Sequence, residues 1–293
     1  MSVLSAPSPD EEPSQDSARP SPRPQIALPD PNIHEGRDAT FHVHAQVSGE
    51  HTILGGRDIA VMLPREHTQD PKRRFPVLFM LDGENLFESL PSTFQGPKWQ
   101  VAKTCRCLIN EGAMEPVIIV AISNGGNAAR MADYTHKSHP EWPEGATGFA
   151  HNFAAFLYTQ LIPVINDRYP TLPERTGIIG SSLGGLFCLF SKTEFPDHIQ
   201  RIGALSPSLQ WDDGELVRRY EYLQNTGARI FLAAGAQESA PLRGFTSELF
   251  ALMREAGWDV CSAYPDAIDP RGKHSELSWR EQLKEMLPRL YPY

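Results

Sequence analysis

A single turn between two apolar runs constrains this chain more than any other stretch of its sequence. Residues 177–179 have the composition of a buried strand, and residues 186–190 begin like a helix. Between them, residues 180–184 read Gly-Ser-Ser-Leu-Gly, which fits the pattern G-x-S-x-G. The chain must pass from strand to helix within a few residues, and the two glycines allow neighbouring backbone to approach closely. This arrangement predicts a strained backbone at Ser182, with its Oγ exposed at the top of a sheet.

A serine held in such a turn is suited to nucleophilic attack. The helix that follows supplies free N–H groups and the positive end of its dipole to a developing oxyanion. The alternative is a glycine-rich turn that only packs a helix onto a sheet. Because the pattern also arises by chance in unrelated proteins, partner residues must decide between these interpretations.

Apolar runs that alternate with helical patterns predict an α/β fold. The strand-like runs are residues 76–81, 117–122, 201–205, 229–234 and 259–264, and the helical patterns are residues 99–111, 149–168, 214–224, 245–256 and 275–287. The alternation indicates βαβ units, hence a mainly parallel central sheet with helices on both faces. Three earlier stretches, residues 40–46, 53–54 and 57–63, predict an antiparallel N-terminal edge. We expect Pro163 to kink its helix and residues 127–148 to be irregular.

The chain divides by composition into a tail and a domain. Residues 1–38 contain eight prolines and many Ser, Asp and Glu residues. Such a segment cannot bury enough apolar surface to offset the entropy lost on ordering, so we predict a disordered tail. Residues 39–293 are expected to form one α/β domain.

Composition also limits the partners of the chain. The formal net charge is −9 and no basic cluster occurs, which argues against a nucleic-acid partner. No run approaches the roughly 18 apolar residues of a membrane span, and the first residues lack the features of a secretory signal. His42 and His44 share a strand face without a third ligand, so we expect both to face solvent, and the four cysteines lack metal-ligand spacing. A cytoplasmic protein without metal or other cofactor is expected.

Four features follow predicted strands and are expected to meet at one edge of the sheet. They are residues 82–84, the turn at Ser182, Glu238 and His274. Ligands and catalytic groups of open α/β sheets gather at the carboxyl ends of the strands. The order Ser, acid, His along the chain is that of the α/β-hydrolases.

These residues suggest definite roles in acyl transfer. Ser182 needs a base, for which His274 is the candidate, and Glu238 would orient the imidazole. We expect the N–H groups of Leu183 and Glu84 to form an oxyanion hole, with Gly83 permitting the close approach. The alternatives are a surface histidine and a solvated loop carboxylate. Rival acids are Asp266 and Asp269, although they lie close to His274 in sequence.

Five residues are predicted to contact substrate. Asp82 and Gly83 precede the expected oxyanion donor, and Arg130 and Tyr134 lie in the segment that follows the strand over residues 117–122. Arg130 would attract an anionic or catechol-bearing substrate, or else form a structural ion pair. Trp211 would line the acyl pocket, or else pack on the sheet.

Several motifs together resemble the putative-esterase family. They are the runs 77–87, 161–170, 180–185 and 203–208, together with Asn124, Arg130 and Tyr134, and His274 followed by Trp279 and Arg280. The family includes enterochelin-esterase-like enzymes, S-formylglutathione hydrolase, feruloyl and acetylxylan esterases and mycolyltransferases. The resemblance covers residues 40 to 290, and the short enterochelin-esterase-like proteins are the most similar subgroup. It implies an α/β-hydrolase fold, ester hydrolysis without metal, and the roles given above for Ser182, His274, Glu238, Glu84 and Leu183. Some members of the subgroup use a Ser–His dyad.

The sequence therefore predicts a serine carboxylic-ester hydrolase that works through an acyl-enzyme. Its expected partner is a small-molecule ester, small or siderophore-like, and the oligomeric state is left open. An acyltransferase using the same acyl-enzyme is one alternative. A non-catalytic α/β-hydrolase scaffold used for binding is another, since fold alone does not determine function.

Overall fold

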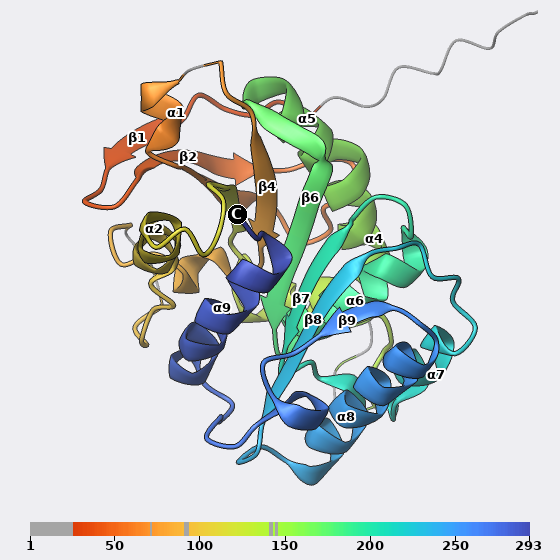
Figure 1. Ribbon diagram of the computed structural model, residues 1–293. Helices are drawn as coiled ribbons and strands as arrows, with labels where there is room; N and C mark the ends of the chain where they lie inside the picture. Colours follow the sequence, from red (N-terminus) through yellow and green to blue (C-terminus); the bar gives the residue numbers. More distant parts are fainter. Residues whose placement is uncertain (1–25, 71, 91–93, 141–142, 144–145) are drawn as a thin grey trace, which may run out of the picture.

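The computed structural model describes residues 26–70, 72–90, 94–140, 143 and 146–293. Within these residues one sheet of ten strands runs through the molecule (Figure 1). Its order is β1-β2-β3-β5-β4-β6-β7-β8-β10, and β9 also pairs with β8. The strands are β1 Asn32–Glu35, β2 Thr40–Val47, β3 Arg57–Leu63, β4 Phe75–Met80, β5 Ile118–Ile122, β6 Thr171–Ser181, β7 Arg201–Leu205, β8 Arg229–Gly235, β9 Asp259–Cys261 and β10 Ile268–Asp269.

The strand directions confirm the predicted sheet. β1, β2, β3 and β5 pair antiparallel in that order. β5, β4, β6, β7 and β8 pair parallel, as do β9 and β10 with β8. The carboxyl ends of the parallel strands therefore share one edge of the sheet, where the predicted site residues follow them.

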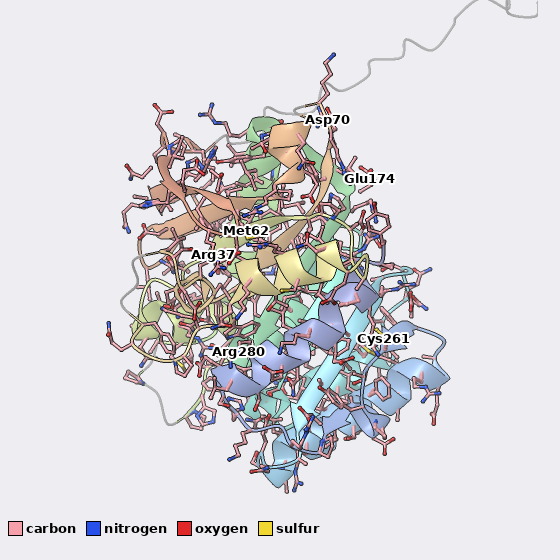
Figure 2. The ribbon with its side chains drawn as sticks, turned by 60° about the vertical axis from the view of Figure 1, so that its left-hand side comes forward. Arg37, Met62, Asp70, Glu174, Cys261 and Arg280 are labelled. Atoms are coloured by element: carbon pink, nitrogen blue, oxygen red, sulfur yellow. The ribbon has the colours of Figure 1, made fainter. Side chains whose placement is uncertain are left out.

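Two layers of helix cover the sheet, because its central strands are apolar on both faces. In β4, Val77 and Phe79 pack in one core and Leu78 and Met80 in the other. One face is covered by α2 Val101–Asn110 and α9 Glu276–Leu290, which lie side by side in Figure 2. The other face carries α3 Asn127–Tyr134, α4 Ala150–Phe156, α5 Ile162–Arg168, α6 Leu183–Glu194, α7 Glu215–Tyr220 and α8 Ala240–Glu255. A one-turn helix, α1 Glu66–Gln69, precedes β4.

Several local predictions were wrong. Asn32–Glu35 forms strand β1 within the predicted tail, because residues 32–35 pair with β2, whereas residues 1–25 lie outside the described residues. Residues 127–134 form helix α3 rather than an irregular segment. Residues 53–54 form a bend, not a strand. By contrast, the helix predicted over residues 149–168 is present as α4, a π-helical turn, Leu157–Leu161, and α5, with Pro163 in the first turn of α5.

The two histidines of β2 are not both solvent-facing. His44 is fully buried, and its Nε2 lies 2.6 Å from the hydroxyl of Tyr169, which covers this strand face. His42 is half-buried, with its Nδ1 3.3 Å from the same hydroxyl. Burial lowers the pKa of both imidazoles. The pair therefore belongs to the packing of β2 against the end of α5.

Candidate active site

The turn at Ser182 has the strained geometry that its sequence predicts. Ser182 follows β6 with φ 57° and ψ −123°, a backbone conformation that residues other than glycine rarely adopt. A Cβ on Gly180 would lie 2.4 Å from the carbonyl carbon of Gly184, so only glycine fits there. The Ser182 N–H donates to the Leu205 carbonyl at 2.9 Å, and the Ser208 N–H donates to the Ser182 carbonyl at 3.1 Å. The end of β7 thus holds the turn in place.

His274 lies next to this serine although 92 residues separate them in the chain. The loop after β10 carries His274 to the carboxyl edge of the sheet, and its Nε2 lies 2.9 Å from the Ser182 Oγ. Its side chain is 42% exposed, so a substrate can reach the Ser–His pair from solvent. The predicted nucleophile and base are therefore within hydrogen-bonding distance.

Glu238 completes a hydrogen-bonded chain of three side chains. Its Oε2 lies 3.1 Å from the Nδ1 of His274, and its side chain is only 1% exposed. Its Oε1 accepts the Gly235 N–H at 2.8 Å and the Ser206 hydroxyl at 2.6 Å. A buried carboxylate needs such donors to offset the loss of water. They leave Oε2 to face the imidazole.

The rival acids serve other contacts. The two oxygens of Asp269 accept the Arg271 N–H at 3.0 Å and the Gln282 amide at 3.3 Å. Asp266 lies in a short 3₁₀ segment, Pro265–Ala267, that packs against α8. Of the three acids considered, Glu238 is the one that the structure brings to His274.

The predicted oxyanion loop lies beside the serine turn. Leu183 is the first residue of α6, so its N–H is one of those that the helix cannot satisfy internally. Residues Gly83–Asn85 form a 3₁₀ turn after β4, and the Asp82 Oδ2 lies 3.6 Å from where a Gly184 Cβ would stand. A Cβ on Gly83 would lie 2.8 Å from the backbone of Ile122, which explains the glycine.

Both the carboxylate and the backbone of Glu84 are held within this loop. Its carboxylate accepts the Asn124 N–H at 3.1 Å, and its carbonyl accepts the Lys98 ammonium at 2.6 Å. Burial, and to a lesser degree the nearby Asp82 carboxylate, raises the pKa of the Glu84 carboxyl. The loop that should supply the second oxyanion donor is therefore held from both sides.

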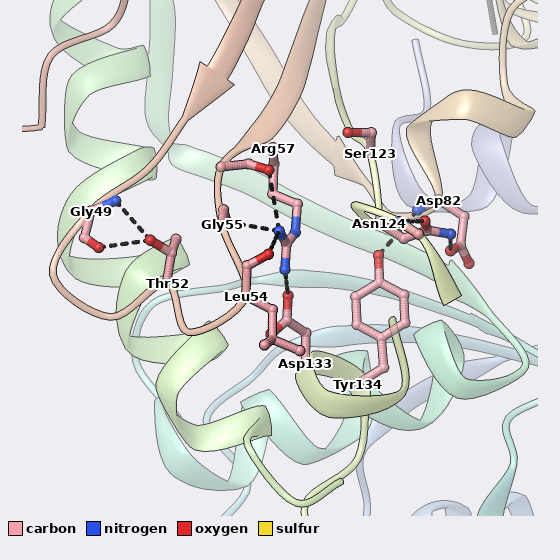
Figure 3. A network of polar contacts seen from close by, with 12 residues as sticks. Gly49, Thr52, Leu54, Gly55, Arg57, Asp82, Ser123, Asn124, Asp133 and Tyr134 are labelled. Carbon is pink, nitrogen blue, oxygen red and sulfur yellow. Dashed lines mark hydrogen bonds and ion pairs between the residues drawn. The ribbon is translucent and has the colours of Figure 1, made fainter. Parts of the chain in front are cut away.

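Arg130 and Tyr134 converge on Asp82. The Arg130 Nε and Nη2 donate to the two Asp82 oxygens at 2.7 and 2.9 Å, and the Asn124 amide donates to the same carboxylate at 2.8 Å. The Tyr134 hydroxyl accepts the Asp82 N–H at 3.3 Å (Figure 3). Tyr134 is 1% exposed and Arg130 21%. This geometry favours the structural ion pair for Arg130 and makes Tyr134 a support of the Asp82 turn.

A buried ion pair fixes the helix that carries Arg130 and Tyr134. The carboxylate of Asp133 in α3 accepts a hydrogen bond from the Nη2 of Arg57 (Figure 3). The Nη1 of Arg57 donates to the Leu54 and Gly55 carbonyls at 3.2 and 2.8 Å. Both side chains are at most 5% exposed. The start of β3 therefore anchors α3 at the carboxyl edge of the sheet.

Trp211 is placed farther along the same edge. It lies in a 3₁₀ segment, Leu209–Asp212, where its Nε1 donates to the Lys137 carbonyl at 3.1 Å and its ring packs 4.7 Å from that of His139. These contacts tie residues 137–139 to the segment after β7.

Three neighbours of the site were missed. The Ser208 Oγ lies 3.3 Å from the Ser182 Oγ, the Ser206 hydroxyl donates to Glu238, and Trp279 donates its Nε1–H to Ser206 at 2.9 Å. The two serines follow β7, which is the strand next to β6, so their position after a strand was the available signal.

A cavity of about 790 Å³ adjoins the oxyanion loop. Its apolar lining includes Val43, Ala60, Phe87 and Ala121, and it reaches Gly83–Asn85 through Gly83 and Glu84. Among the residues that the structure describes, no three His, Cys, Asp or Glu side chains are placed to hold a metal ion. Nor is any helix in that part of the chain long and apolar enough to cross a membrane.

The sequence comparison decides the family. The model of the family described as putative esterase matches residues 51–290. The chain belongs to this family. It is therefore an enzyme of the carboxylic-ester hydrolase class, in agreement with the prediction.

Two curated relatives of this chain are named as esterases. The ferri-bacillibactin esterase of Bacillus subtilis is 28% identical over 200 residues, covering 62% of the chain and 66% of the relative. The iron(III) enterobactin esterase of Escherichia coli is 25% identical over 222 residues, covering 72% of the chain and 48% of the relative. The chain thus spans between about half and about two thirds of the length of these two relatives.

Solved structures show the same fold. An IroE-like serine hydrolase from Shewanella oneidensis superposes with a TM-score of 0.67 at 21% identity, over 81% of the chain and 76% of that structure. The enterobactin hydrolase IroE in complex with DFP gives a TM-score of 0.66 at 18% identity, over 88% of the chain and 98% of that structure. The fold of this esterase is therefore the predicted α/β-hydrolase fold.

Proposed function

We propose that this esterase cleaves its substrate through an acyl-enzyme on Ser182, with His274 as base and Glu238 as orienting acid. The observation that carries the proposal is the hydrogen-bonded chain from the Ser182 Oγ through both nitrogens of His274 to the Glu238 Oε2. Glu238 accepts the Nδ1–H, so the Nε2 lone pair faces the serine hydroxyl. His274 takes the serine proton as Oγ attacks the ester carbonyl, and returns it to the alcohol that leaves.

The Leu183 and Glu84 N–H groups are proposed to bind the oxyanion. Leu183 begins α6, where the helix dipole favours negative charge, and Glu84 lies in the turn beside the serine. One such donor typically contributes about 3 kcal/mol of transition-state stabilisation. Water then attacks the acyl-enzyme, and the same histidine acts as base for this second step.

A siderophore-like ester is the proposed substrate class. Two curated relatives are named for bacillibactin and enterobactin, which are siderophores. Asp82, Gly83 and Trp211 remain the proposed substrate-side residues, whereas Arg130 and Tyr134 support the Asp82 turn.

The first test is active-site labelling. A fluorophosphonate should form one adduct, mapped to Ser182, that is absent in Ser182→Ala and slowed in His274→Ala. Hydrolysis of p-nitrophenyl esters should fall by at least about 10⁴-fold in Ser182→Ala, because the covalent route is lost.

The substrate is tested next with a catecholate trilactone, using mass spectrometry of the products. A free acid as product supports hydrolysis, whereas a new ester formed with an added alcohol would indicate an acyltransferase. A folded wild-type protein that forms no adduct on Ser182 would refute the proposed mechanism and favour the binding scaffold.

A further inference from the structure

The carboxylate of Glu238 is held by more than its histidine. Its side chain is 1% exposed, and its Oε1 receives the Ser206 hydroxyl at 2.6 Å and the Gly235 N–H at 2.8 Å. Two donors on one oxygen direct the other oxygen toward His274. The Gly235 donor is backbone and comes with the strand end, so Ser206 is the side chain on which this orientation depends.

Ser206 itself occupies an unusual position. It is fully buried at the end of β7, and its φ of 46° lies in the left-handed region that few non-glycine residues enter. Its N–H donates to the Ala233 carbonyl of β8 at 2.6 Å. Such backbone strain persists only where the surroundings maintain it. Here it turns the hydroxyl toward the start of the loop that carries Glu238.

The directions of the hydrogen bonds follow from the chemistry of the groups. The Trp279 indole nitrogen can only donate, and it lies 2.9 Å from the Ser206 Oγ. The ionised Glu238 carboxylate can only accept. Ser206 therefore accepts from Trp279 and donates its own proton to Glu238. Successive donors in a buried chain polarise one another, which strengthens the bond to the carboxylate.

Trp279 also contacts the imidazole of His274, the residue that Glu238 orients. Its ring stands edge-on to the His274 imidazole, with centroids 5.1 Å apart and an interplanar angle of 82°. The indole is 6% exposed and packs against Trp99 beneath it. One side chain of α9 thus restrains both the base and, through Ser206, the acid that orients it.

We propose that Ser206 and Trp279 are positioning residues for the Glu238–His274 pair. This inference rests on the proposed function of Ser182, His274 and Glu238. Ser206 fixes the Glu238 carboxylate in the rotamer that presents Oε2 to Nδ1, and Trp279 fixes Ser206 and the imidazole plane. Ser206 and Trp279 act on the charge and orientation of His274 and not on substrate affinity.

The test compares Ser206→Ala with Ser191→Ala. Ser191 is a matched control: its hydroxyl is also fully buried and also bonds a side chain, the Tyr158 hydroxyl at 2.8 Å, but it lies in α6 away from the acid and base. For p-nitrophenyl acetate we expect kcat of Ser206→Ala to fall by about 10- to 100-fold with KM within about twofold. The acidic limb of its kcat/KM profile should move to lower pH, because a misplaced carboxylate stabilises the imidazolium less. Ser191→Ala should lose thermal stability only.

Trp279→Phe provides a second variant that keeps an aromatic ring and removes the N–H. Its kcat should fall less than that of Ser206→Ala. The double variant should be no slower than Ser206→Ala alone, because both changes break one hydrogen-bond chain. Independent, multiplicative losses in the double variant would overturn the proposal.

A readout independent of turnover separates this inference from the proposed function. The His274 titration is followed by NMR in the Ser182→Ala background, with and without Ser206→Ala. A lower His274 pKa on loss of the Ser206 hydroxyl supports the positioning role even if the enzyme turns over no ester. An unchanged titration, or a folded Ser206→Ala variant with wild-type kcat and pH profile, overturns it.

Discussion

At the scale of single residues, the proposed chemistry depends on which atoms accept and which donate. Glu238 accepts three hydrogen bonds, two on Oε1 and one on Oε2. The His274 tautomer follows from this, because an acceptor at Nδ1 leaves Nε2 unprotonated and 2.9 Å from the serine oxygen. A dyad would tolerate loss of the acid, whereas a triad would not.

Glu238→Gln separates these two cases. The Gln oxygen should occupy the Oε1 position, where it keeps the Gly235 and Ser206 donors, so the amide NH₂ must face Nδ1. This NH₂ donates, which favours the tautomer with the proton on Nε2 and removes the base. We expect kcat/KM for p-nitrophenyl esters to fall by about 10² to 10⁴-fold, with the fold retained. Near wild-type activity in the folded variant would instead indicate a Ser–His dyad.

At the scale of elements, the site depends on the junction of β6 and α6. The last residues of β6 pair with β7, and α6 begins at the residue after Ser182. Gly180 and Gly184 allow the two elements to cross at van der Waals distance. The same junction places the Leu183 N–H at the start of α6, where we propose that it binds the oxyanion, so the packing and the proposed chemistry require the same residues.

Gly180→Ala tests this junction. The new Cβ would meet the Gly184 backbone at 2.4 Å, so β6 or α6 must shift. Overpacking of this kind typically costs about 1–3 kcal/mol, and the displaced serine should lower the fluorophosphonate labelling rate as well.

The control is Gly244→Ala in α8, which is exposed and where a Cβ has no atom within 4 Å. Removing a helix-interior glycine there should stabilise the protein by up to about 1 kcal/mol. Urea unfolding of wild type, Gly180→Ala and Gly244→Ala measures both changes in the free energy of unfolding. Equal stability and labelling in Gly180→Ala and wild type would contradict the role given to the junction.

At the scale of the whole molecule, two apolar cores enclose several ionisable groups. Burial raises the pKa of Tyr169 to about 12 and lowers that of Lys192 to about 8. Tyr134, Tyr158, Tyr220 and Tyr291 are also buried, and burial raises the pKa of each phenol. The free energy of unfolding must therefore change with pH on the alkaline side.

Lys192 and the buried phenols change the free energy of unfolding with opposite signs as the pH rises. Between about pH 8 and 10.5 the unfolded chain binds a proton at Lys192 that the folded chain has lost, so stability rises with pH. The phenol contribution is fully present below about pH 10 and is lost above it, because the unfolded chain ionises first. The buried thiols of Cys105 and Cys188 add a loss of stability that begins near pH 9, because burial raises their pKa above the ordinary value of 9.0. We therefore expect maximal stability near pH 9, and above pH 10 a further fall of about 1.4 kcal/mol per pH unit for each buried phenol.

Thermal unfolding between pH 8 and 12 checks this expectation. Tyr169→Phe should make the fall above pH 10 shallower. Tyr222→Phe is the matched control, because Tyr222 is 87% exposed, and it should leave the slope unchanged. A melting temperature that does not fall between pH 10 and 12 would contradict the phenol contribution.

Much of the fold and of the site was predictable because its signals are local. The β4 run is apolar at every position, as a strand buried on both faces requires, and the order of Ser182, Glu238 and His274 follows the order of strand ends. The predictions failed where a distant partner decides the structure. Strand β1 exists because it pairs with β2, and His44 is buried because Tyr169 covers it. Neither partner can be inferred from neighbouring residues.

The sequence by itself determined the turn at Ser182, the α/β alternation and the three residues proposed for the chemistry, since each depends on short-range sterics or on the regular edge of a parallel sheet. Only the tertiary structure decided how these residues are held. In the folded chain, Arg130 binds Asp82. Ser206, at the end of β7, bonds both Trp279 of α9 and Glu238, which follows β8. Such contacts join elements far apart in sequence, and their geometry arises only when both layers of helices pack on the sheet.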